Sequence, residues 1–206
     1  MDSGITVTGT GQATAPADLL RLTLSVGQDA PDVAAAVALV AERTDAVNAV
    51  LRDLGVGPAD IQTSSVNVHP QYGESMSVAG YRASHSLTVT TKDLTGFGRL
   101  LNAAVSAAGN SLGLDYLQFD VEDKTALLVR ARELAFAQAS EKAKQLASLT
   151  GQDLGSIGAV SETFGHVPIR EMAMAKPSAA GYDSSLTVTP GEQTIEVTLE
   201  VRWNWA

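Results

Sequence analysis

The five residues from Gly109 to Gly113 contain a serine between two glycines, a spacing that is typical of hydrolase nucleophiles. In a nucleophile elbow a strand precedes the serine and a helix follows it, because that sharp turn exposes the hydroxyl. Here a helical pattern comes before Ser111 and a strand pattern comes after it. The order favours a helix C-terminus followed by a turn, and a hydrolase that uses Ser111 is therefore the least favoured of three functional hypotheses.

A second glycine motif, Gly9-Thr10-Gly11, resembles the start of a dinucleotide-binding loop. Such loops need a third glycine and a helix whose first amides face the phosphates. Thr14 stands where the third glycine is required, and the segment continues as a strand. We therefore interpret the motif as part of a glycine-containing strand, and we expect no cofactor.

The three histidines, His69, His85 and His166, show no metal-ligand spacing with one another, so the sequence predicts no metal site. His85 lies on the apolar face of a predicted strand, as a hydrogen-bonded core histidine would. The second hypothesis, a small-molecule or peptide-binding module, places a ligand near the polar loop 70–80. Its candidate site residues are His69, Tyr72, Tyr81 and Arg82.

The last predicted strand has Val201, Trp203 and Trp205 on its apolar face. Such residues are usually part of a core, but tryptophan is also enriched where proteins contact one another. Both interpretations stay open at this point. Their place near the end of the sequence makes these three residues the candidate oligomer interface.

Strands with alternating apolar residues and helices with apolar residues every three or four positions together predict an α+β fold. The expected order is ββαββαβαββ, in antiparallel or mixed sheets with helices packed on one face. The first two strands, 5–11 and 20–26, are expected to form a hairpin, and the third, Ile61–His69, to carry a bulge at Ser64-Ser65. We expect 164–184 to be a long mobile loop.

One long central helix dominates this pattern, from Asp123 as its N-cap to Gly151 in the left-handed position after its last turn. Its predicted buried stripe consists mainly of alanine, which allows close packing against a sheet. The stripe comprises Leu128, Ala131, Ala135, Ala139, Ala143, Leu146 and Leu149.

Composition limits the classes of partner. The chain has 206 residues, a formal net charge of −9 and no cysteine. The negative charge disfavours nucleic acid as a partner, and no apolar run reaches the roughly 18 residues that a membrane span needs. The beginning of the sequence shows no signal-peptide pattern. We expect a cytoplasmic protein, with an exported, periplasm-like protein whose signal has been removed as the alternative.

Short motifs along nearly the whole chain resemble the SIMPL-type domain of bacterial periplasmic immunogenic proteins and their stress-related relatives. They are Ile5–Gly11, Pro16, Asp18, Gly55, Asp60–Thr63, Pro70, Tyr72, Gly80–Ala83, Ala131-Arg132, Lys142-Ala143, Gly151, Leu154-Gly155 and Pro190-Gly191.

The resemblance implies an α+β fold, homo-oligomers in some members, an association with oxidative stress and no known catalytic residues. Residues 1–206 are then a single SIMPL-type domain or two intertwined subdomains. The first hypothesis is a non-catalytic SIMPL-type protein that self-assembles into a homo-oligomer, with a role in stress protection or scaffolding.

Overall fold

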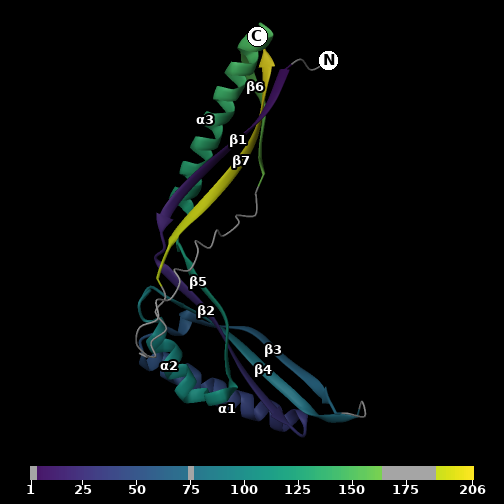
Figure 1. Cartoon of the computed structure of the whole chain (residues 1–206), viewed down its shortest axis with the longest axis vertical. Helices are drawn as coiled ribbons and strands as arrows, with labels where there is room; N and C mark the ends of the chain where they lie inside the picture. Colours follow the sequence, from purple (N-terminus) through teal and green to yellow (C-terminus); the bar gives the residue numbers. More distant parts are fainter. Residues whose placement is uncertain (1–3, 74–76, 164–188) are drawn as a thin grey trace, which may run out of the picture. The chain divides into compact units, whose positions relative to one another are not determined.

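The computed structural model describes residues 4–73, 77–163 and 189–206 of the chain (Figure 1). These residues form two compact units. Unit 1 contains 4–16, 121–163 and 191–206, and unit 2 contains 17–120 with residues 189 and 190. The loop predicted at 164–184 lies outside the described residues.

Unit 1 is a three-stranded antiparallel sheet with one long helix on one face. The strand order is β1-β7-β6, so that the first and last strands of the chain are neighbours. Figure 1 shows α3 (green) lying along β1 (purple) and β7 (yellow). The elements are β1 (Gly4–Pro16), α3 (Thr125–Thr150), β6 (Leu154–Thr163) and β7 (Glu192–Trp205).

The buried residues of helix α3 form a single row of alanines that packs on the sheet: Ala131, Ala135, Ala139, Ala143 and Ala147. The predicted alanine stripe is confirmed, but Leu146 and Leu149 are exposed and were wrongly included in it. Instead, the buried residues repeat every four positions, and the row ends at Ala147. Gly151 has the predicted left-handed conformation (φ 66°).

Close packing of α3 on β1 depends on Gly9 and Gly11. A Cβ at Gly9 would overlap the carbonyl oxygen of Ala135, and one at Gly11 would overlap that of Ala131. The helix backbone therefore lies directly against the strand backbone. This close approach explains the motif that resembled a dinucleotide loop, and here the motif serves packing.

Unit 2 is a four-stranded antiparallel sheet of order β3-β4-β2-β5. Two helices pack on one of its faces, over a core that includes Leu22, Leu24 and Val89. The other face carries the polar residues that alternate with them. The elements are β2 (Leu19–Ala30), α1 (Val33–Asp53), η1 (Pro58–Asp60), β3 (Ile61–Tyr72), β4 (Val78–Thr91), α2 (Phe97–Ala108), η2 (Gly109–Ser111) and β5 (Leu112–Asp120).

The predicted fold class and element order are confirmed: both sheets are antiparallel, and the order is ββαββαβαββ. The bulge predicted in β3 is present, because the register with β4 shifts between Thr63 and Ser65. The hairpin predicted between the first two strands is wrong. β1 pairs with β7 in one sheet, whereas β2 pairs with β4 and β5 in the other.

Candidate functional site

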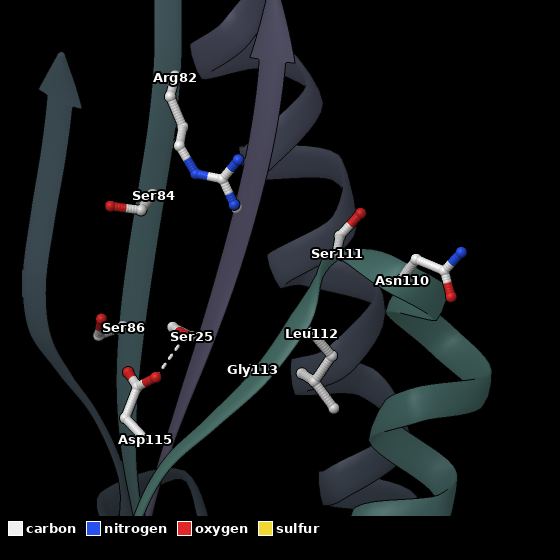
Figure 2. Close-up of a pocket in the computed structure, with 10 residues that line it drawn as sticks. Ser25, Arg82, Ser84, Ser86, Asn110, Ser111, Leu112, Gly113 and Asp115 are labelled. Carbon is white, nitrogen blue, oxygen red and sulfur yellow. Dashed lines mark hydrogen bonds between the residues drawn. The ribbon is translucent and has the colours of Figure 1, made fainter.

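A polar cavity of about 330 Å³ lies in unit 2, on the sheet face that α1 and α2 leave uncovered (Figure 2). Three strands and the turn before β5 supply its lining. Figure 2 shows Arg82, Ser84 and Ser86 of β4 on one side of the cavity, Asn110, Ser111 and Leu112 on the other, and Asp115 joined to Ser25 by a hydrogen bond. The lining residues are Ser25, Gly27, Arg82, Ser84, Ser86, Asn110, Ser111, Leu112, Gly113 and Asp115.

Two glycines inside strands keep this cavity open. A Cβ at Gly27 would stand 2.9 Å from Nη2 of Arg82, and one at Gly113 would stand 2.6 Å from Oγ of Ser25. Neither glycine has a positive φ, so the backbone conformation does not require glycine at either position. A glycine in a strand interior weakens the strand and often marks a close approach of a ligand or another chain segment. The free space beside the backbones of Gly27 and Gly113 therefore needs an explanation.

Asp115 enters the cavity through a β-bulge. In the pairing of β2 with β5, Thr23 is opposite Tyr116 and Leu24 is opposite Leu114, which leaves Asp115 as the extra residue. Bulges frequently re-aim a side chain next to a functional site. The Asp115 carboxylate accepts a hydrogen bond of 2.9 Å from the Ser25 hydroxyl, which fixes one of its oxygens at the cavity wall.

Arg82 supplies the positive charge of the cavity. Its guanidinium lies over Gly27 and forms an ion pair of 3.0 Å with Asp29. Gln71 donates a hydrogen bond of 2.8 Å to the same carboxylate. Both charged side chains are more than half exposed, and exposed ion pairs of this kind contribute about 0–1 kcal/mol. The Arg82 guanidinium can therefore leave the Asp29 carboxylate and bind another carboxylate with little loss of free energy.

Ser111 is placed as the element order predicted, after a helix and before a strand. Its hydroxyl accepts a hydrogen bond from Nε2 of Gln28. Among the described residues that line the cavity there is no histidine to act as a base. The geometry gives no support to a hydrolase that uses this serine.

The ligand residues predicted from the sequence do not share the cavity, which includes Arg82 alone. His69 pairs with Arg82 across the ladder and lies on the same sheet face. Tyr81 lies on the opposite, helix-covered face, where it packs beside Ala36 and Val40. Tyr72 is 63% exposed near the end of the β3–β4 hairpin.

The other two histidines add nothing to the cavity. His85 lies beside Thr63, with 2.9 Å between its Nε2 and the threonine hydroxyl. His166 lies outside the described residues. Residues 4–73, 77–163 and 189–206 contain no group of three or more histidine, aspartate or glutamate side chains placed to hold a metal ion.

The three residues of the predicted oligomer interface lie on β7 in unit 1. Val201 is fully buried and Trp203 is 6% exposed, in the core beneath α3. The ring of Phe136 on α3 contacts Trp203 with a centroid distance of 6.2 Å. Trp205 is half-buried and pairs with Leu154 at the start of β6. The side chains of Val201 and Trp203 are thus covered within one chain.

The cavity residues missed by sequence reasoning are Gly27, Gly113, Asp115 and the serines of β2 and β4. Serines at positions 84 and 86 alternate with apolar residues, and this indicated only an exposed strand face. An available signal was the presence of glycines inside two strands whose neighbours otherwise alternate regularly.

Comparison with known proteins identifies the family. The model of the family SIMPL, described as "Protein of unknown function (DUF541)", matches residues 5–203. The chain belongs to the SIMPL family. It is 30% identical to the 26 kDa periplasmic immunogenic protein of Brucella melitensis over 96% of this chain and 82% of that protein. It is 29% identical to the uncharacterized protein YggE of Edwardsiella ictaluri, over 93% of this chain and 81% of that protein.

The relationship extends to the protein YggE of Escherichia coli K12, at 27% identity over 85% of this chain and 72% of that protein. These matches confirm the resemblance found in the sequence motifs. In the described part of this SIMPL protein, no helix combines the length and the apolar character needed to cross a membrane.

Proposed function

We propose that this SIMPL protein is non-catalytic and self-assembles into a homo-oligomer through the open edge of β6 in unit 1. The observation that carries the proposal is a contrast between the two outer edges of the three-stranded sheet. One edge, on β1, is covered in its middle by side chains of α3. The other edge, on β6, has no such protection.

Two polar side chains of α3 cover the middle of the β1 edge. Oε1 of Gln138 accepts the backbone N–H of Thr10 at 2.8 Å. Nζ of Lys142 donates to the carbonyl oxygen of Thr8 at 2.9 Å. These contacts satisfy backbone groups that would otherwise be available to pair with another strand.

In the described residues, the outer side of β6 lacks the contacts from side chain to backbone that α3 makes on β1. Among the described residues no strand pairs with its outer side, since β6 is the last strand of the order β1-β7-β6. Proteins usually protect such edges with lysine, proline or inward charges. The sequence of β6 has neither lysine nor proline. Its single charge, Glu162, lies on the face that bears α3, where Arg132 binds it at 3.0 Å, and register shifts interrupt only the first half of the strand, 154–159. The segment 159–163 pairs regularly with β7, so its outer edge is straight enough to accept a strand.

Exposed apolar side chains accompany this edge. Ile157 is 46% exposed and Val160 is 54% exposed, although they pair with Trp203 and Val201 on the sheet face that bears α3. Phe136 on α3 is 38% exposed. α3 covers β1 and β7 but leaves most of β6 uncovered. A second copy that adds its own β6 would bury these side chains and satisfy the edge, in a two-fold arrangement.

The test is the mass in solution, measured by light scattering over a range of protein concentrations. We expect a discrete oligomer for the wild type and a smaller species for Val160→Lys, since a lysine at this edge opposes strand pairing. Val66→Lys, at an exposed position of β3 in unit 2 (61% exposed), is the matched control and keeps the wild-type mass. A monomeric wild type, or an unchanged mass in Val160→Lys, contradicts the proposal. Removing 203–206 is a poorer test, because it deletes the buried Trp203.

We propose that the oligomer acts outside the cytoplasm, in a periplasm-like compartment. The support is that the Brucella relatives are named periplasmic proteins, and a fold without cysteine needs no particular redox environment. This replaces the cytoplasmic expectation, which gains no support from the relatives. Fractionation of cells that express the protein from its own gene tests the location, and recovery in the cytoplasm contradicts it.

The proposed biological role is stress protection or scaffolding, and its support is the family resemblance. A strain that lacks the gene is expected to survive peroxide less well, and complementation with the wild-type gene restores survival. The Val160→Lys gene connects the role to assembly. If the monomeric variant restores survival fully, the protective role does not require the oligomer.

A further inference from the structure

We propose that the polar cavity of unit 2 binds a small zwitterion whose ammonium and carboxylate groups lie close together, of the α- or β-amino-acid class. In this arrangement Arg82 binds the carboxylate and Asp115 binds the ammonium group. The proposal concerns a site on a different unit from the β6 edge and is independent of self-assembly.

The first argument is the pair of opposite charges in the lining. The guanidinium of Arg82 lies beside Gly27, and the carboxylate of Asp115 lies beside Ser25. Gly27 and Ser25 are two residues apart on the same face of β2, so their Cα atoms are about 7 Å apart and the two charged groups lie beside successive positions of that face. Arg82 forms its ion pair with Asp29, outside the cavity lining.

The spacing sets the size of the ligand. A charge-assisted hydrogen bond measures about 2.8 Å, and one such bond at each end lets a short ligand reach from the guanidinium beside Gly27 to the carboxylate beside Ser25. A ligand whose two charges are joined by one or two carbon atoms has this reach. A carboxylate offers about four lone-pair sites, so Asp115 can accept an ammonium group while it holds Ser25.

The second argument is the space that the strand glycines keep free. Any side chain at Gly27 or Gly113 would reach the atoms that carry the charges or that hold them. The cavity volume of about 330 Å³ lies at the small end of the range for ligand sites, about 300–1,000 Å³. A free amino acid is of suitable size.

The third argument is the chemistry of the remaining lining. Ser84 and Ser86 project from β4 toward the same face as Arg82 (Figure 2), and Asn110 and Ser111 of η2 also line the cavity. No aromatic side chain is found among the described lining residues, and Leu112 is the one large apolar side chain among them. Such a surface favours a small ligand rich in hydrogen-bonding groups. It offers no stacking partner for a nucleobase, and Asp115 disfavours a ligand that is only anionic.

The test is a titration of the full chain, labelled with ¹⁵N, with L-serine as the probe and NMR as the readout. We expect the amide signals of Gly27, Gly113 and Asp115 to shift in a saturable way. Acetate and methylamine, which each carry one of the two charges, are expected to bind at least about tenfold more weakly, because each lacks one charged hydrogen bond. 6-Aminohexanoate carries both charges too far apart and is expected to bind as weakly.

Variants assign the binding to the cavity. Arg82→Gln and Asp115→Asn are expected to weaken L-serine binding about tenfold or more. Arg99→Gln is the matched control, because Arg99 is also an exposed arginine of unit 2 paired with an aspartate, at a position away from the cavity. Its affinity stays at the wild-type value.

Gly27→Ala separates binding from folding. The new methyl group would meet the far end of the flexible Arg82 side chain, which can move aside, so the fold is kept. The methyl group and the displaced guanidinium then occupy the site, and binding is lost. The proposal is overturned if L-serine gives no saturable shift, if acetate alone binds as tightly, or if Gly27→Ala binds L-serine as the wild type does.

Discussion

Single atoms decide how closely α3 packs on β1. At Gly11 the helix carbonyl of Ala131 occupies the position that a side chain would need, and both partners are backbone. Neither side can move without shifting a whole element. Overpacking of this kind costs about 1–3 kcal/mol and sometimes more.

We therefore expect Gly11→Ala to lower the free energy of unfolding by about 3 kcal/mol, measured by urea denaturation. Gly191→Ala is the control, because its Cβ would meet no heavy atom within 4 Å in the same unit. A change within about 0.5 kcal/mol is expected there. Equal effects of the two substitutions would contradict the close contact of helix and strand.

A second prediction concerns Asp93, in the turn before α2. The hydroxyl of Thr95 donates a hydrogen bond of 2.9 Å to its carboxylate and is the main reason that the pKa of Asp93 lies below its usual 3.8. Arg99 adds a smaller effect in the same direction. Because the folded pKa is depressed, the ionised carboxylate stabilises the fold above about pH 4, and this contribution is lost as the pH falls through the folded pKa.

Carboxyl NMR titration provides the measurement. Thr95→Val is expected to raise the midpoint of Asp93 toward 3.8. Asp123 is the internal control, since the hydroxyl of Thr125 lowers its pKa in the same way and is left intact. If Thr95→Val leaves the Asp93 midpoint unchanged, the hydroxyl is not the cause of its low pKa.

At the residue scale the sequence predicted packing better than it predicted the site. The alanine stripe followed from helical periodicity, because burial repeats with the turn of the helix. The cavity did not follow, because its residues come from three strands whose register no local pattern specifies. Asp115 is inside only because of a bulge against β2, and Arg82 was predicted in one site with Tyr81, which lies on the other face.

Among the elements, α3 both packs on the sheet and protects its β1 edge. Gln138 holds the amide of Thr10, which points away from β7. Since alternate residues of a strand point their amides to opposite sides, the amide of Gly11 points toward β7. The two neighbouring amides thus depend on different partners.

Gln138→Leu is therefore expected to speed hydrogen exchange at the Thr10 amide and to leave exchange at the Gly11 amide unchanged. The stability cost is about 0.5–1.5 kcal/mol, the usual net value of one hydrogen bond. Lys144→Gln, on the exposed face of α3, serves as the control and changes neither rate. Unchanged exchange at Thr10 in Gln138→Leu would show that the edge is closed by something else.

The order of elements was predictable because each element has a local pattern, but the partner of β1 was not. Consecutive strands are the usual neighbours, and the turn-like sequence between Pro16 and Asp18 favoured a hairpin. The actual partner, β7, lies at the other end of the sequence. Both strands have an apolar face that needs α3, and this shared requirement appears only when the sheet is assembled.

In the whole molecule, the two units differ in how the chain builds them. The hydrophobic core around Leu22 and Val89 draws its residues from 17–120 alone. The core of unit 1 needs β1 from one end of the chain, β7 from the other and α3 between them. The core of unit 2 thus comes from one continuous stretch of sequence, whereas the core of unit 1 forms only when segments far apart in the sequence come together.

We expect a fragment of residues 17–120 to fold on its own, because it contains both helices and all four strands of its sheet. Circular dichroism should show a cooperative thermal transition, and dispersed amide NMR signals should show fixed packing. The control fragment, 121–206, lacks β1 and leaves the alanine row of α3 partly uncovered, so we expect it to lack a cooperative transition. A disordered 17–120 fragment would mean that unit 2 depends on unit 1 for its stability. The chain would then fold as one cooperative whole.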